Sequence, residues 1–116
     1  MEPTLSLYAM SAVYIMAGIA HFAAQRIFIK IIPPWVPYPQ KVNLAVGVAE
    51  LALGVMLLFP STQAISAWLI MILLVAIFPA NIYHFLLARK AGRGVMITAL
   101  RLPLQLPLIY WAWLFT

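Results

Sequence analysis

The sequence predicts an all-α protein, a membrane-embedded four-helix bundle, and three observations lead to this prediction. First, 66% of the 116 residues are hydrophobic and only 8% are charged, which is more apolar surface than a soluble domain of this length can bury. Second, the apolar residues form four runs, each near the ~20 residues that a helix needs to cross a bilayer. Third, most of the charges lie in the connections between these runs. The length suits one domain, residues 1–116.

Four helices are expected, at residues 4–24, 42–59, 64–88 and 95–115. The second and third are joined by Pro60-Ser61-Thr62-Gln63, a tight hairpin whose hydroxyl groups can cap the third helix. The third is followed by Gly92 and Gly94, which are placed for helix termination.

A proline-rich segment, Pro33-Pro34-Trp35-Val36-Pro37-Tyr38-Pro39, separates the first two helices. It cannot be an ordinary helix, because each proline removes a backbone donor and restricts the residue before it. Its tryptophan and tyrosine suit the lipid headgroup layer. We therefore expect an interfacial or re-entrant segment. A proline-rich ligand for another protein's recognition domain is the weaker alternative.

The basic residues predict the orientation in the membrane. They flank the first connection and fill the third, and the second has none: Arg26, Lys30, Lys41, Arg89, Lys90 and Arg93. The positive-inside rule places both basic connections in the cytoplasm and both termini outside it, in a multi-pass protein of the plasma (bacterial inner) membrane. No basic region precedes the first helix, so we expect no cleaved signal peptide. The net charge of +5 fits anionic lipid headgroups better than nucleic acid.

Polar and small residues recur at spacings of three and four along the first two expected helices, and the other two helices add polar residues of their own. Such spacing places each set on one stripe, which we expect to face the bundle interior. The stripes are Ser11, Tyr14, Gly18, His21 and Gln25; Asn43, Gly47, Glu50 and Gly54; Asn81 and His84; and Thr98, Arg101 and Gln105. Ionisable residues inside a membrane mark functional sites by default. The candidate ligand-binding residues are His21, Glu50, Asn81, Arg101 and Gln105.

Glu50 is the one charge in the run of residues 45–59. On a rise of ~1.5 Å per residue, Glu50 lies about 12 Å and Arg101 about 9 Å inside the cytoplasmic surface. An unpaired charge at mid-membrane costs ~2.5 to 3.5 kcal/mol or more, and opposite charges at matched depth offset much of that cost. Arg101 is therefore the predicted partner of Glu50. The pair either fixes the helix register alone or lines a site, and both readings stay open.

The two histidines, His21 and His84, lie at similar depth on different helices. Haem ligation by both is a weak alternative, since two histidines are little evidence for a cofactor, and no third ligand clusters with them for a metal ion. Cysteine is absent, which excludes disulfides, thiolate ligands and a cysteine nucleophile. We assign no catalytic residue, and a redox role would need a bound cofactor or a partner.

Several short motifs together resemble the DoxX-like family of small four-helix membrane proteins over nearly the whole chain. They are Gly18-x-x-His21-Phe22, Pro33-Pro34-Trp35-x-Pro37, Gly47-x-x-Glu50-x-x-x-Gly54, Phe78-Pro79-Ala80-Asn81 and Arg101-x-Pro103-x-Gln105 followed by Trp111. The five candidate residues fall inside these motifs, and His84 does not. The resemblance implies an accessory role, because relatives occur with a terminal quinol oxidase, with thiosulfate–quinone oxidoreduction and with membrane oxidative-stress complexes. A distant animal branch assists receptor assembly.

The function expected from these observations is an accessory subunit of a membrane redox system, whose polar cleft binds a quinone or a similar apolar ligand with a polar head. Its expected partners are the lipid bilayer and a membrane or peripheral oxidoreductase, and self-association into a homo-oligomer stays open. The alternative is a non-catalytic assembly factor that packs against another membrane protein through the aromatic-rich last helix, residues 110–115. The sequence leaves open whether any reaction is catalysed.

Overall fold

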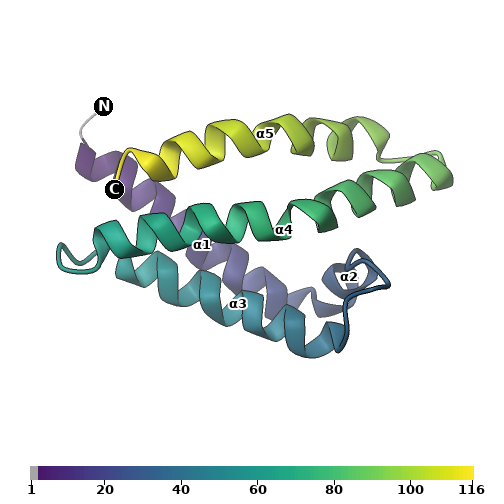
Figure 1. The fold of residues 1–116 in the computed structure, drawn as a ribbon, viewed down its shortest axis with the longest axis horizontal. Helices are drawn as coiled ribbons and strands as arrows, with labels where there is room; N and C mark the ends of the chain where they lie inside the picture. Colours follow the sequence, from purple (N-terminus) through teal and green to yellow (C-terminus); the bar gives the residue numbers. More distant parts are fainter. Residues whose placement is uncertain (1–2) are drawn as a thin grey trace.

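The computed structural model describes residues 3–116, which form an all-helical structure (Figure 1). The helices are α1 (Pro3–Ala23), α2 (Gln25–Lys30), α3 (Pro39–Met56), α4 (Gln63–Ala91) and α5 (Val95–Trp113). Within this part of the chain, three helices are long and apolar enough to cross a membrane: α1 from Leu5 to Ala23, α4 and α5. The predicted all-α class is confirmed, and these three helices are compatible with a membrane protein.

Helix α3 differs most from its predicted range. It begins at Pro39, before the expected residue 42, and ends at Met56, before the expected residue 59. It also carries Gln40, Lys41, Asn43 and Glu50, which make it more polar than the other long helices. It is therefore not among the three helices that qualify as spans by length and composition.

The first connection contains the short helix α2, which the sequence pattern did not predict. Its six residues are too few for a helical period to be recognised, but they are amphipathic, with Arg26 and Lys30 exposed one turn apart and Phe28 half-buried. Residues 31–38 then form turns, as the prolines require. Tyr38 adopts a left-handed conformation (φ 51°) directly before Pro39, the first residue of α3.

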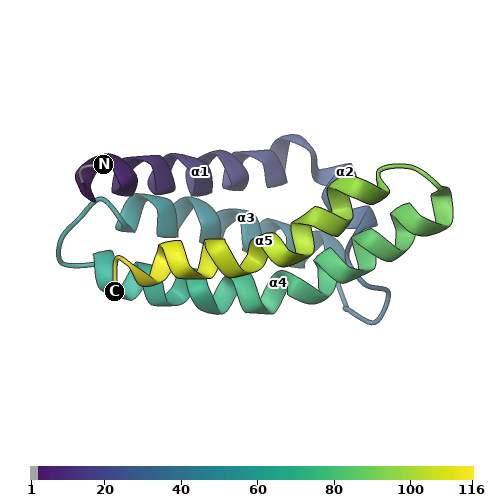
Figure 2. The same cartoon turned by 90° about the horizontal axis from the view of Figure 1, so that it is seen from above.

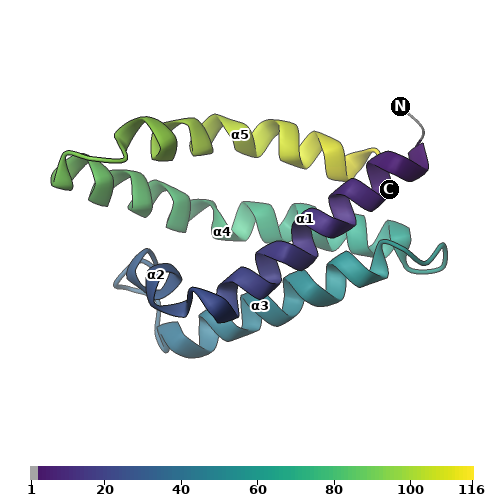
Figure 3. The same ribbon diagram turned by 180° about the vertical axis from the view of Figure 1, so that it is seen from behind.

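The helices pack as two pairs. Helix α1 lies along α3, and α4 lies along α5 (Figure 1, Figure 2). The pairs meet where the α3–α4 hairpin brings these two helices together, and they diverge toward the end of the molecule that holds α2 (Figure 3). One end of the molecule is therefore closely packed, and the other is open between the pairs.

Glycines set the distance between α1 and α3. A Cβ atom added at Gly18 would lie 2.7 Å from Leu51 Cγ and 2.8 Å from the carbonyl oxygen of Gly47. A Cβ atom at Gly54 would lie 2.7 Å from Ile15 Cγ1. Both contacts are too short for any real side chain, so the small residues that recur on the predicted stripes allow the two backbones to touch.

The packed end holds the apolar core and several polar ties between helices. Met10, Leu57 and Ile70 are completely buried there. The Ser11 hydroxyl donates to the carbonyl oxygen of Gly54 at 2.6 Å, and the Ser66 hydroxyl donates to that of Leu53 at 2.6 Å. A further tie between α5 and α1 is the bond from Trp111 Nε1 to Ser6 Oγ at 2.9 Å. These bonds satisfy buried hydroxyl and indole groups, as an apolar environment demands.

The basic residues of the connections gather at the open end. They belong to α2, the start of α3, the end of α4 and the α4–α5 connection: Arg26, Lys30, Lys41, Arg89, Lys90 and Arg93. Figure 1 shows these segments at one end of the molecule and both chain ends with the α3–α4 hairpin at the other. The molecule is therefore electrically asymmetric along its long axis.

The glycine contact gives a prediction about stability. We expect Gly54→Leu to lower the free energy of unfolding in mild detergent by about 1–3 kcal/mol, because the new side chain meets Ile15 across a closed interface. The matched control is Ala52→Leu, two residues away on the exposed face of the same helix, which should change stability little. Thermal unfolding followed by circular dichroism measures both. Equal melting temperatures for the two variants would contradict the close approach of α1 and α3.

Candidate functional site

The open end of the molecule contains a cavity of about 1110 Å³ between the two helix pairs. Every helix contributes to its wall, and α2 and the proline-rich segment contribute Phe28, Pro33 and Trp35. Most of the lining is apolar. The polar side chains in the lining include His21, Asn43, Glu50, Asn81, His84 and Arg101. A cavity with this lining suits a molecule that is mostly apolar and has a polar head.

The structure brings four of the five candidate residues to this cavity. His21 comes from α1, Glu50 from α3, Asn81 from α4 and Arg101 from α5. The helical spacing explains the convergence, because each residue lies on the stripe that its helix turns toward the other three. His84, which stands outside the motifs that resemble a known family, lines the same cavity.

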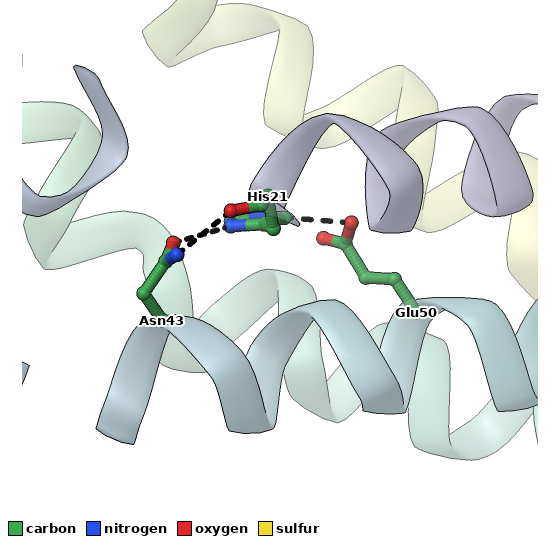
Figure 4. A network of polar contacts seen from close by, with 3 residues as sticks. All are labelled: His21, Asn43 and Glu50. Atoms are coloured by element: carbon green, nitrogen blue, oxygen red, sulfur yellow. Dashed lines mark hydrogen bonds and ion pairs between the residues drawn. The ribbon is translucent and has the colours of Figure 1, made fainter. Parts of the chain in front are cut away.

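The spacing of three residues on α3 forms the surface against which His21 packs. Asn43, Gly47 and Glu50 lie four and three residues apart, so they share one face of the helix over two turns. A Cβ atom at Gly47 would lie 3.0 Å from His21 Cβ. The histidine therefore lies against the glycine, with Asn43 on one side and Glu50 on the other (Figure 4).

Asn43 holds His21 by two hydrogen bonds and fixes its tautomer. The amide Nδ2 donates to the carbonyl oxygen of His21 at 2.9 Å, in the last turn of α1 where carbonyls lack helical donors. The amide Oδ1 therefore faces His21 Nδ1, at 2.8 Å. Since an amide oxygen only accepts, Nδ1 must carry the proton of this bond. The other ring nitrogen, Nε2, is directed toward Glu50.

The prediction that Arg101 is the ion-pair partner of Glu50 is wrong. Glu50 is buried, and its Oε2 lies 3.5 Å from His21 Nε2. Within residues 3–116, no ion pair joins Glu50 to Arg101. The error arose because depth along a helix axis does not say how far apart two helices lie. Helix α1 touches α3 through the glycine contact, whereas α5 packs along α4 and not along α3.

Arg101 and Asn81 present donors that have no partner. In the described part of the chain, Arg101 Nη1 and Asn81 Nδ2 are buried and form no hydrogen bond. Both residues line the cavity from the α4–α5 side, opposite the His21–Glu50 pair. Buried polar groups in folded proteins are nearly always bonded, so exceptions require an explanation. Glu50 Oε2, in the same cavity, also forms no hydrogen bond in the described chain, but it faces His21 Nε2 at 3.5 Å.

Gln105, the fifth candidate, lies outside this cavity. Its side chain is buried, and Nε2 donates to the carbonyl oxygen of Leu74, in the turn of α4 that precedes Pro79. It lines a smaller pocket of about 590 Å³ beside Pro79 and Pro103. The residue thus ties α5 to α4. The stripe on α5 was expected to bring Arg101 and Gln105 to the same site, but they meet different surroundings.

Sequence reasoning missed two residues of the site. Asn43 was placed on the same stripe as Glu50 but not chosen, because it lies outside the motif that begins at Gly47. Phe28 stacks on the His21 ring, with centroids 4.0 Å apart and planes inclined by 30°. It lies on α2, the unpredicted helix, so no periodic pattern pointed to it.

The fold and site define the class of this protein: a helical protein with helices of membrane-spanning length and a mostly apolar cavity with a polar wall. Within residues 3–116, no group of three or more histidine, aspartate or glutamate side chains could hold a metal ion. The chain belongs to the family described as Domain of unknown function (DUF8561), whose model matches residues 10–116. No curated protein and no solved structure matches the chain.

The hydrogen bonds of Asn43 give a prediction. We expect Asn43→Leu to lower the free energy of unfolding by about 1–3 kcal/mol, because it leaves the Nδ1–H group and the last-turn carbonyl of His21 without partners. The control is Asn81→Leu, which removes a side chain whose Nδ2 donates to no group in the described chain. Thermal unfolding in detergent should show the larger loss for Asn43→Leu. The opposite order would mean that Asn43 does not hold the histidine.

Proposed function

We propose that this chain binds a membrane-soluble ligand in the cavity between its helix pairs, and that the ligand has an apolar tail and a small head rich in hydrogen-bond acceptors, as a quinone has. One observation carries the proposal: two buried donors, Arg101 Nη1 and Asn81 Nδ2, have no partner in the described chain and line a cavity that is otherwise mostly apolar. Ligand pockets of about 300–1,000 Å³ hold drug-sized molecules, and this cavity, at about 1110 Å³, is slightly larger than that range.

The roles of the residues follow from their chemistry. Arg101 and Asn81 donate hydrogen bonds to the oxygen atoms of the head group. His21 or Glu50, on the opposite wall, exchanges a proton with the head group. The tail lies along the apolar lining contributed by α4, α5 and the proline-rich segment. Gln105 has no role in binding and holds α5 to α4.

The membrane arrangement belongs to the same proposal. All four long helices cross a bacterial inner membrane as a bundle, α3 included. Asn43 and Glu50 line the cavity and contact α1, and Leu44, Val48 and Val55 are apolar and exposed. The polar, exposed residues Gln40 and Lys41 lie in the first turn of α3, at the open end. Helix α2 and the proline-rich segment lie at the interface, where Trp35 and Tyr38 are more than two-thirds exposed. The clustering of basic residues at the open end supports a cytoplasmic position for that end.

The biological setting is an accessory subunit of a membrane redox system. Support for this setting comes from the resemblance of the sequence motifs to the DoxX-like family, and an oxidoreductase partner would supply the redox centre. An assembly role is the second candidate. It is favoured by Tyr110 and Trp113, which are exposed and stack with centroids 6.0 Å apart, a pair that suits either a partner helix or the lipid interface.

The proposed orientation can be checked by labelling. Thr62, in the α3–α4 connection, and Ala91, the last residue of α4, lie at opposite ends of the molecule, and single cysteines can be introduced at both because the chain has no cysteine of its own. With intact cells, an impermeant thiol reagent should label the cysteine at 62 and leave that at 91 unlabelled until the membrane is opened. Labelling of position 91 from outside, with position 62 protected, would reverse the orientation.

The proposed ligand class can be tested with a soluble quinone analogue. Titration should quench the fluorescence of Trp35, which lines the cavity, and the variant Trp35→Phe supplies the blank. We expect Asn81→Leu to weaken the affinity several-fold, since it removes one donor without creating a buried charge, a change of about 1 kcal/mol. The control Val48→Ala, on the exposed face of α3, should bind as the natural protein does. If the folded natural protein shows no saturable quenching, the ligand proposal fails and the assembly role takes its place.

A further inference from the structure

The charges on the cavity wall restrict the chemical class of the ligand, and His21 and Glu50 are two of the ionisable groups on that wall. Asn43 fixes the proton of His21 on Nδ1, so Nε2 faces the Glu50 carboxyl group either as a lone pair or as a second N–H. A lone pair opposite an ionised carboxylate would bring two acceptors together, which is repulsive. An N–H group on Nε2 instead faces the carboxylate as an ion pair at 3.5 Å, although Glu50 Oε2 forms no hydrogen bond in the described chain. As such an ion pair, His21 and Glu50 carry no net charge.

The net charge of the cavity wall depends on all of its ionisable side chains. Its titratable lining residues are His21, Glu50, His84 and Arg101. Arginine stays protonated in proteins, so its charge cannot be removed by losing a proton. His84 can add positive charge but never negative charge. Because the His21–Glu50 pair contributes no net negative charge, the cavity wall is left with the uncompensated positive charge of Arg101.

The positive charge of Arg101 lies in apolar surroundings without a counterion from the described chain. Within the described chain, Arg101 forms no ion pair, and its Nη1 is buried without a hydrogen bond. A charge of this kind at membrane depth is unfavourable by ~2.5 to 3.5 kcal/mol or more unless a counterion lies near. Asn81 Nδ2, on the neighbouring helix α4, is a second unpartnered donor on the same wall. A guanidinium and an amide donor that line one cavity are well suited to bind an oxyanion.

We propose that the cavity binds an amphiphile with an anionic oxygen head group, a carboxylate or a phosphate, and one long apolar chain. Arg101 neutralises the head and, together with Asn81, donates hydrogen bonds to its oxygen atoms. The apolar lining between α4, α5 and the proline-rich segment takes the chain. This inference rests on the proposed ligand-binding function and replaces its neutral, quinone-like head with an anionic one.

The test compares head groups on one tail. The probes are a long-chain fatty acid brominated in its tail, the alcohol of the same chain and the monoalkyl phosphate of the same chain, because bromine quenches tryptophan on contact. Quenching of Trp35 is titrated in uncharged detergent, with Trp35→Phe as the blank. We expect the acid or the phosphate to bind about tenfold more tightly than the alcohol, the ratio that one charged hydrogen bond of ~1.4 kcal/mol gives. Whichever of the two binds more tightly identifies a carboxylate or a phosphate as the preferred head.

Variants then assign the preference to Arg101. Arg101→Gln should bind the acid and the alcohol equally, and Arg101→Lys, which keeps the charge, should retain part of the preference. The control Arg93→Gln removes an exposed charge at the same end of the molecule and should retain the full preference for the acid over the alcohol. Acetate and inorganic phosphate, which lack the tail, should not compete.

The outcomes separate this inference from the function on which it rests. Equal affinities of the natural protein for acid, phosphate and alcohol would overturn the anionic head, whether or not any variant folds. If saturable binding of the quinone analogue accompanied that result, the proposed function would stand. If no probe showed saturable binding, both the anionic head group and the proposed ligand-binding function would be contradicted. A preference for the acid that persists in a folded Arg101→Gln variant would mean that another group provides the charge.

Discussion

Helices α1 and α3 touch through glycine, and the polar wall of the cavity depends on that contact. Gly18 leaves no room for a Cβ atom between the two backbones, and a Cβ atom at Gly47 would lie a tight 3.0 Å from His21 Cβ. His21 is thereby brought against α3, where Asn43 bonds both its ring and its carbonyl and Glu50 faces its other nitrogen. The small-residue contact thus does more than pack two helices, because it places an ionisable pair.

The two ends of the molecule differ for a physical reason. At the packed end, apolar side chains and short bonds from Ser11 and Ser66 to helix carbonyls draw α1, α3 and α4 together. At the other end, the α4–α5 pair is held to itself and diverges from α1 and α3, and the resulting space is lined by all the helices. Close packing at one end therefore leaves the core intact while the other end contains the cavity.

The polar groups of the cavity fall into two sets with different electrostatic roles. His21 and Asn43 bond each other and, with Glu50, form the α1–α3 wall. Arg101 and Asn81 form the α4–α5 wall and have donors without partners in the described chain. Glu50 Oε2 also lacks a hydrogen bond there, but it faces the His21 ring at 3.5 Å, whereas no acidic side chain in the described chain pairs with Arg101. This division is why the proposed ligand is assigned to Arg101 and Asn81, with the histidine–glutamate pair opposite.

The sequence by itself determined the helical class, the approximate position of each long helix, the small-residue contact between the first two of these and most of the residues that line the cavity. These features follow from composition and from spacing along one helix, and both can be read from a single chain. Only the tertiary structure decided that Glu50 faces His21 and not Arg101, that Gln105 bonds the backbone of α4, and that Asn43 and Phe28 belong to the site. Each of these depends on the distance and rotation between two helices. Periodicity says which face of a helix is polar, but it does not say which neighbour that face meets.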